Sequence, residues 1–136
     1  MKAGTSVLTG GPGNGGLDLQ IMSDLVRQIA QLRQDLSAQI LLVTSGAIAA
    51  GQEALGRGTG LVQGKDIPSR QVLAAIGQGR LMHTYQELFA DHGIQVAQNL
   101  LTINDLADRQ SYLNVRNTLA GLLDLGILPI LNENDV

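Results

Sequence analysis

Residues 40–51 constrain the fold more than any other part of this sequence. The first four form an unbroken aliphatic run, which is typical of a strand buried on both faces of a parallel sheet. Thr44, Ser45 and Gly46 then lead into an alanine-rich segment. Thr and Ser cap helices well, and Gly allows a ligand to approach the backbone closely. The stretch therefore predicts a strand that turns directly into a helix capped by Thr44 or Ser45.

The rest of the chain continues this alternation of strands and helices. Residues 1–8 resemble the end of a first strand. Apolar spacing and capping residues predict helices over 18–36, 70–91 and 102–125, and strands over 94–101 and 127–131. We therefore expect one α/β domain over residues 1–136, a three-layer α/β/α sandwich around a mainly parallel sheet.

Two glycines inside the helix predicted over 70–91 indicate close packing. Each weakens a helix by about 1 kcal/mol relative to Ala, so Gly77 and Gly79 are expected to face a neighbouring element or a ligand. The apolar residues expected to point inward are Leu73, Ile76, Leu81, Tyr85 and Leu88 in this helix and Tyr112, Val115, Leu119, Leu122 and Leu123 in the next.

The composition excludes several classes of protein. The sequence has no Cys, no Trp and one Phe, which excludes disulfides and thiolate metal sites and disfavours surfaces that stack nucleic-acid bases. A net charge of −3 argues against nucleic acid or an anionic membrane as the main partner. No apolar run approaches the roughly 20 residues that span a bilayer, and no apolar core follows Lys2 as in a signal peptide. We expect a cytoplasmic protein.

Polar residues at the ends of predicted strands indicate a binding crevice. Ser45 and Asp135 face the same crevice if the sheet is parallel, and free N–H groups at a helix N-terminus attract anions. Lys2 lies beside a glycine-rich turn, where a cation can meet phosphate oxygens. Each residue also has a simpler interpretation: Lys2 as a solvated charge, Ser45 as a plain cap, and Asp135 as the cap of a following helix.

The glycine-rich segment contains the pattern G-x-G-x-x-G at Gly11, Gly13 and Gly16. A dinucleotide site also needs an acidic residue at the end of the second strand. That strand ends at residues 43–45, which contain no acid, and Asp35 lies before it. The sequence therefore disfavours a dinucleotide site.

Four segments, in the same order, resemble the glutamate 5-kinases, a group within the amino acid kinase family. They are residues 2–9 (KAGTSVLT), 43–51 (VTSGAIAAG), 73–78 (LAAIGQ) and 129–135 (PILNEND), and the stretch 108–119 is also similar. Each segment is short, but the ordered set is specific. This chain departs from the family pattern at Ala3, Arg70 and Asn117, where a bulkier apolar residue, a lysine and an aspartate are usual.

The resemblance implies a transferase that uses ATP and Mg²⁺. The reaction would phosphorylate the γ-carboxylate of L-glutamate to γ-glutamyl phosphate, the first step toward proline. Implied partners are L-glutamate and ATP, with no nucleic acid and no membrane, and a homo-oligomer is expected. Acetylglutamate kinase and aspartokinase are alternatives within the family. A non-catalytic α/β binding or assembly module is an alternative of another class.

The resemblance also assigns roles to individual residues. Lys2 would contact the transferring phosphoryl group as the catalytic residue. The phosphate and ATP site would comprise Lys2, Gly4, Thr5, Gly10 and Gly11, and the substrate site Ser45, Gly46, Ala47, Asn134 and Asp135. No metal ligand is assigned.

The family's kinase domain continues well past Asp135, into segments that contact adenine and ribose and supply another phosphate-binding lysine. We therefore expect the chain to be the N-terminal, amino-acid-binding part of a kinase domain, incomplete at both ends and inactive on its own. ATP that is not held in position transfers its phosphoryl group slowly, because positioning can supply roughly 7–11 kcal/mol of barrier reduction.

Overall fold

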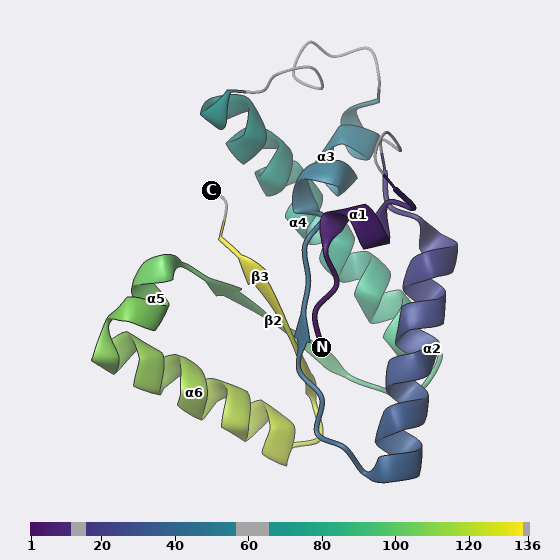
Figure 1. The fold of residues 1–136 in the computed structure, drawn as a ribbon, viewed down its shortest axis with the longest axis vertical. Helices are drawn as coiled ribbons and strands as arrows, with labels where there is room; N and C mark the ends of the chain where they lie inside the picture. The colour runs from purple at the N-terminus through teal and green to yellow at the C-terminus, as the bar shows by residue number, and fades with distance from the viewer. Residues whose placement is uncertain (12–15, 57–65, 135–136) are drawn as a thin grey trace.

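The computed structural model describes residues 1–11, 16–56 and 66–134 and shows an alternating α/β chain. Its elements are α1 (Thr5–Leu8), α2 (Leu19–Leu36), β1 (Leu42–Val43), α3 (Ala47–Leu55), α4 (Ile67–Ala90), β2 (Val96–Leu101), α5 (Ile103–Ala107), α6 (Arg109–Asp124) and β3 (Leu128–Glu133) (Figure 1). The α/β fold class predicted from the sequence is confirmed.

The described strands form a parallel sheet in the order β1-β3-β2. Ile130 of β3 pairs with Leu42 on one side and with Gln98 on the other. A parallel bridge between Lys2 and Val43 places the N-terminal segment beside β1. Since all these segments run in one direction, their carboxyl ends meet at a single edge of the sheet.

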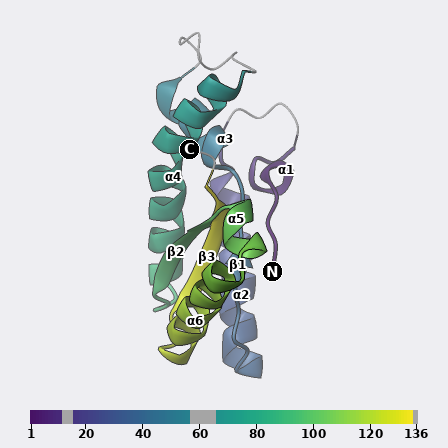
Figure 2. The ribbon, with the colours of Figure 1, turned by 90° about the vertical axis from the view of Figure 1, so that its left-hand side faces the viewer.

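Helices cover both faces of this sheet. α2 and α4 lie on one side and α6 on the other, as Figures 1 and 2 show. The core lies between the sheet and helices α2 and α4. Its large buried side chains include Met22, Val26, Ile29, Leu42, Leu81, Tyr85, Phe89, Leu128 and Ile130. The layers therefore agree with the expected sandwich, with one side packed much more tightly.

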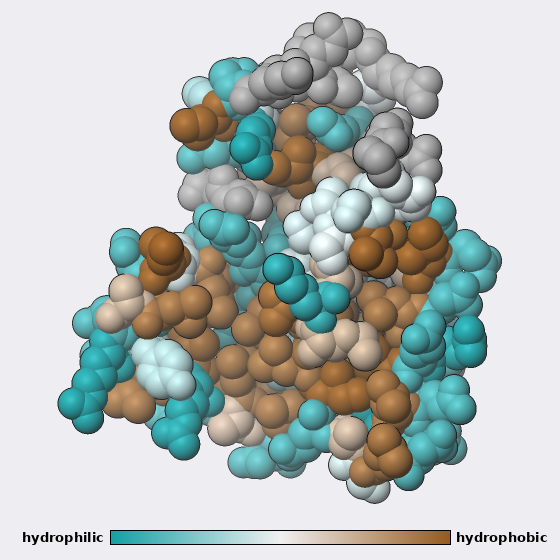
Figure 3. Space-filling model, in the orientation of Figure 1, coloured by the Kyte–Doolittle hydropathy of each residue, from teal (hydrophilic) through white to brown (hydrophobic). Residues whose placement is uncertain are grey.

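The side of the sheet near α6 is only partly covered. α6 contributes no fully buried residue, and Tyr112 is 48% exposed, so the prediction that this side chain points into the core is wrong. Val7, Val43 and Leu106 are also exposed. Figure 3 shows hydrophobic residues gathered over the lower half of the face seen in Figure 1.

Two strand predictions are wrong in extent. Residues 1–8 do not form a strand throughout, because the chain pairs only around Lys2 and then turns at Gly4 into the short helix α1. The aliphatic run 40–43 is a strand only at Leu42 and Val43. Hydrophobic runs identify buried segments, but the length of a strand depends on how far its neighbours extend beside it.

The helix ends follow their capping residues. The carboxylate of Asp18 accepts hydrogen bonds from two backbone N–H groups of the first turn of α2, which confirms the predicted cap. α4 begins at Ile67, earlier than predicted, because Asp66 caps it and Pro68 fits its first turn. The helix predicted over 102–125 is two helices, since Asp108 ends α5 and caps α6.

α3 and α4 approach each other backbone to backbone. A Cβ atom on Gly77 would overlap the carbonyl group of Ala47, and one on Gly51 would overlap the carbonyl group of Leu73. The predicted close packing is therefore confirmed at Gly77. At Gly79 a Cβ atom would meet nothing within 4 Å, so the predicted contact with a neighbouring element is wrong there, and a contact with a ligand stays a prediction.

One of the α4 residues predicted to point inward is more exposed than expected. Leu73, Leu81 and Tyr85 are buried as expected, whereas Ile76 is 37% exposed. The contact between Gly77 and α3 fixes which side of the helix faces inward, and Ile76 lies outside that side.

Candidate functional site

The candidate site lies at the edge where the strands end. The N–H of Ala3 donates to the Val43 carbonyl at 2.8 Å, and the N–H of Thr44 donates to the Leu131 carbonyl at 2.8 Å. These bonds hold the ends of the N-terminal segment, β1 and β3 side by side. The residues predicted for the phosphate and substrate sites follow these ends directly.

Thr5 and Ser45 bring two of the predicted loops together. Their hydroxyl oxygens lie 2.8 Å apart, although the residues are 40 positions apart in the sequence. In Figure 1 the start of α1 lies beside the start of α3. The hydroxyl pair therefore joins a residue predicted to bind phosphate to one predicted to bind the acceptor substrate.

Ser45 is not the cap of α3, so that prediction is wrong, and Thr44 is not the cap either. The N-cap is Gly46, with φ 104° and no side-chain hydrogen bond. This left-handed conformation favours glycine. Because the turn is made by Gly46, the Ser45 hydroxyl is directed to Thr5 instead of to the helix backbone.

Unpaired backbone donors follow Ser45 at the start of α3. Among the described residues, the N–H groups of Gly46, Ala47 and Ile48 at the start of α3 donate to no acceptor. Unpaired N–H groups at the first turn of a helix attract negative charge. The turn at Ser45 therefore offers a hydroxyl and several N–H groups that suit a carboxylate.

Lys2 is exposed and forms no ion pair within the described residues. Gly10 and Gly11 have positive φ values of 68° and 119°. The N–H of Gly10 donates to the Val7 carbonyl at 3.3 Å, and the N–H of Gly11 donates to the Ser6 carbonyl at 3.0 Å. In this conformation those two donors are already used, and the phosphate-binding role of both glycines stays a prediction.

α4 holds two adjacent strand ends through one buried and one partly buried hydrogen bond. The Tyr85 hydroxyl lies 2.8 Å from Oγ1 of Thr44, which follows β1. Nδ2 of Asn132, near the end of β3, donates to Oε1 of Gln78 at 2.7 Å. Burial raises the pKa of Tyr85, against the effect of its bond to Thr44, so the phenol stays protonated at neutral pH.

Sequence reasoning assigned no role to Gln78 or Asn132. A signal was present, because a polar amide at the end of an aliphatic strand needs a hydrogen-bond partner when it is buried. The partner itself could not be found, since Gln78 lies 54 positions away.

The end of β3 contains the remaining predicted residues. Asn134 is exposed, and its N–H donates to the Leu101 carbonyl at 2.9 Å. Asp135 and Gly13 lie outside the described residues. The substrate-binding roles of Asn134 and Asp135 stay predictions.

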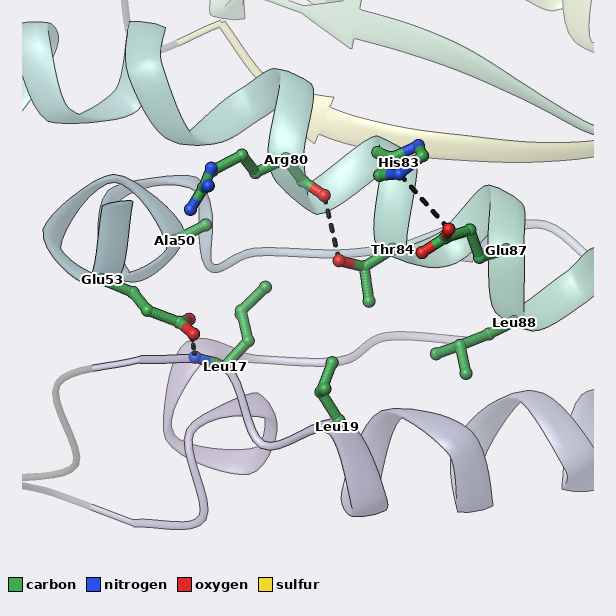
Figure 4. A pocket seen from close by; sticks show the side chains of 9 residues that line it. All are labelled: Leu17, Leu19, Ala50, Glu53, Arg80, His83, Thr84, Glu87 and Leu88. Atoms are coloured by element: carbon green, nitrogen blue, oxygen red, sulfur yellow. Dashed lines mark hydrogen bonds and ion pairs between the residues drawn. The ribbon is translucent and has the colours of Figure 1, made fainter. Parts of the chain in front are cut away.

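A groove of about 370 Å³ lies elsewhere, between α3, α4 and the residues before α2 (Figure 4). Leu17, Leu19 and Leu88 contribute its apolar side. The Glu53 carboxylate accepts a hydrogen bond from the Leu17 N–H, and His83 lies 3.4 Å from Glu87. The described residues that line the groove include none of those predicted to bind phosphate or substrate.

The described residues include no group of three His, Cys, Asp or Glu side chains that could hold a metal ion. Nor is any described helix both long and apolar enough to cross a membrane.

Comparison with known proteins identifies the fold family. The sequence matches the Amino acid kinase family over residues 1–136. The chain belongs to this family. The glutamate 5-kinase of Dehalococcoides mccartyi (strain CBDB1) is 55% identical over 138 residues, covering 100% of this chain and 35% of the relative. The glutamate 5-kinase of Thermus thermophilus is 49% identical over 135 residues, covering 99% and 35%.

A third relative, the glutamate 5-kinase of Syntrophus aciditrophicus, is 50% identical over 135 residues, covering 99% of this chain and 33% of its own length. The chain thus spans about a third of the length of the curated relatives that it matches. The resemblance of the sequence motifs to the glutamate 5-kinases, within the amino acid kinase family, is confirmed.

Proposed function

We propose that the protein is a glutamate 5-kinase, which transfers the γ-phosphoryl group of ATP to the γ-carboxylate of L-glutamate, and that this chain supplies its acceptor side. The observation that carries the proposal is the contact between the Thr5 and Ser45 hydroxyls. It joins the loop predicted to bind phosphate (residues 2–11) to the loop predicted to bind the acceptor (residues 44–47, called the acceptor loop below). Relatives that are 55% and 49% identical to this chain are named glutamate 5-kinase, which favours glutamate as the acceptor within the family.

The acceptor loop has donors suited to a carboxylate. The Ser45 hydroxyl is followed at the start of α3 by the N–H groups of Gly46 and Ala47, which donate to no described acceptor. Hydrogen bonds from several donors fix a carboxylate in one orientation, and orientation lowers the barrier to transfer. We assign the positioning of the acceptor to these groups, with Asn134 and Asp135 as its further ligands.

The first loop has groups suited to phosphate. The Lys2 side chain forms no ion pair within the described part, and the N–H groups of Gly4, Thr5 and Ser6 donate to no described acceptor. ATP supplies the phosphoryl group, and Mg²⁺ neutralises charge on its phosphates. Lys2 would stabilise the charge of the group in transfer. Gly10 and Gly11 would contribute after releasing their present bonds.

The proposal is tested by assaying the full-length gene product with ATP and three acceptors: glutamate, aspartate and N-acetylglutamate. We expect phosphorylation of glutamate in clear preference to the other two. A preference for either of the others would refute the assignment. That the protein is a cytoplasmic homo-oligomer stays a prediction from the sequence.

The Ser45→Ala variant tests the placement of the site. Losing a hydrogen bond to a charged ligand costs about 1.5–3 kcal/mol, so the KM for glutamate should rise about tenfold or more. The KM for ATP should change little. Equal losses for both substrates would show that Ser45 does not lie in the acceptor half of the site. Thr118→Ala is a matched control, because this exposed hydroxyl on α6 donates to the Asn114 carbonyl of its own helix.

A further inference from the structure

Gln78 combines two features that are hard to reconcile with a purely structural role. Its Oε1 accepts the hydrogen bond from Asn132, which is 6% exposed. Its Nε2 is buried and has no hydrogen-bond partner among the described residues. A buried donor without a partner destabilises a fold, and each such group needs a specific reason for being kept.

The position of Gln78 suggests that reason. It follows Gly77, which lies against the carbonyl group of Ala47 at the end of the acceptor loop. The backbone contact leaves α4 no room to move closer to α3. This contact therefore fixes the position of Gln78 relative to the ends of the strands.

Asn132 lies on the face of β3 that points toward α4, in line with the buried residues Leu128 and Ile130. Continuing the pairing of Val43 with Leu131 by one residue places Asn132 level with Thr44, which precedes Ser45. The Asn132 amide therefore lies next to the acceptor loop.

The hydrogen bond to Gln78 determines how the Asn132 amide is oriented. When Nδ2 donates to Gln78, Oδ1 of the same amide points the other way. No described residue donates to this oxygen. An oriented amide oxygen at a strand end suits a positively charged donor such as an ammonium group.

We propose that Gln78 is a positioning residue for the acceptor site: it orients Asn132 so that Oδ1 accepts a hydrogen bond from the α-ammonium group of the amino-acid substrate. The inference rests on the proposed function, because it requires an amino acid in this crevice. It adds a residue on α4 to a site otherwise built from the strand ends, and it explains why an unpaired donor is retained.

The test compares Gln78→Met with wild type in the full-length protein. Met has a similar length, removes the bond to Asn132 and also removes the unpaired donor. We expect the KM for glutamate to rise about tenfold, since the substrate then meets an unoriented amide. The KM for ATP should stay within about twofold. The melting temperature should change little, because the variant removes the unpaired Nε2 of Gln78 but leaves Nδ2 of the buried Asn132 without its acceptor.

A double-mutant cycle with Asn132→Ala shows whether Gln78 acts through Asn132. If it does, the double variant should lose no more glutamate affinity than Asn132→Ala alone. Thr84→Val is the matched control, because among the described residues the Thr84 hydroxyl bonds to the Arg80 carbonyl of its own helix and to no other group. It should leave both KM values unchanged.

The outcomes separate the inference from the proposed function. If wild type neither binds nor phosphorylates glutamate, the proposed function fails, and the acceptor role of Gln78 fails with it. If wild type uses glutamate but Gln78→Met keeps the same glutamate KM, only the inference fails. A lower melting temperature together with equal changes in both KM values would make Gln78 a structural residue and would also overturn the inference.

Discussion

Substituting Gly77 by Ala should separate packing from helix propensity within one helix. A Cβ atom at this position would overlap the carbonyl oxygen of Ala47, and the Ala47 carbonyl carbon would lie 2.9 Å away. These atoms belong to the backbone of α3 and cannot rotate aside as a side chain would. The two helices must therefore move apart, or the turn at residues 44–47 must shift.

The expected net effect follows from two opposing contributions. Overpacking against a rigid neighbour costs about 3 kcal/mol, the upper part of the usual range. Replacing Gly by Ala inside a helix contributes about 1 kcal/mol in the other direction. Gly77→Ala should therefore lower the free energy of unfolding by about 2 kcal/mol.

Gly79→Ala is the matched control, because it lies two residues away in the same helix with nothing within 4 Å of its Cβ position. It should raise the free energy of unfolding by about 0.5–1 kcal/mol. Urea unfolding of both variants, followed by circular dichroism, measures the difference with unchanged slopes. A Gly77→Ala variant as stable as Gly79→Ala would refute the close contact between α3 and α4.

Three further outcomes follow from particular hydrogen bonds. Asp18→Ala removes the cap of α2, with bonds of 3.0 and 3.1 Å to backbone N–H groups, and should cost about 1 kcal/mol in urea unfolding. Tyr85→Phe removes the buried bond to Thr44 and should lower the free energy of unfolding by about 1 kcal/mol while glutamate KM stays unchanged. Hydrogen bonds from Thr102 hold the pKa of Asp105 below its ordinary 3.8. Its stabilising effect is therefore present above about pH 4 and lost as the pH falls through the lowered pKa, so Asp105→Asn should make thermal stability less sensitive to acid.

Much of the fold could be predicted where the signal is local. Asp18, Thr102 and Gly126 end or begin helices as predicted, because capping depends on residues within one turn. The break between α5 and α6 was missed although Asp108 has the right spacing to bond the Ser111 N–H. The apolar periodicity of the sequence continues on both sides of Asp108, and that stronger pattern predicts a single helix.

The candidate site was predictable in its location and less so in its contacts. Parallel strands place their carboxyl ends at one edge, so a strand-end crevice near Ser45 followed from the order of elements. The hydrogen bond between Thr5 and Ser45 and the hydrogen bond from Asn132 to Gln78 join residues 40 and 54 positions apart. No periodicity or cap records such pairs, because they depend on how the helices pack against the sheet.

The order of the strands has a consequence for synthesis on the ribosome. β3 lies between β1 and β2, yet it is made after both of them. Until residues 128–133 leave the ribosome, the nascent chain can assemble α3 on α4, but Leu42 of β1 lacks its partner Ile130. Unpaired strand edges readily join other chains. A nascent chain whose residues 128–133 have not yet left the ribosome is therefore prone to aggregate, because β1 and β2 both lack the strand that lies between them.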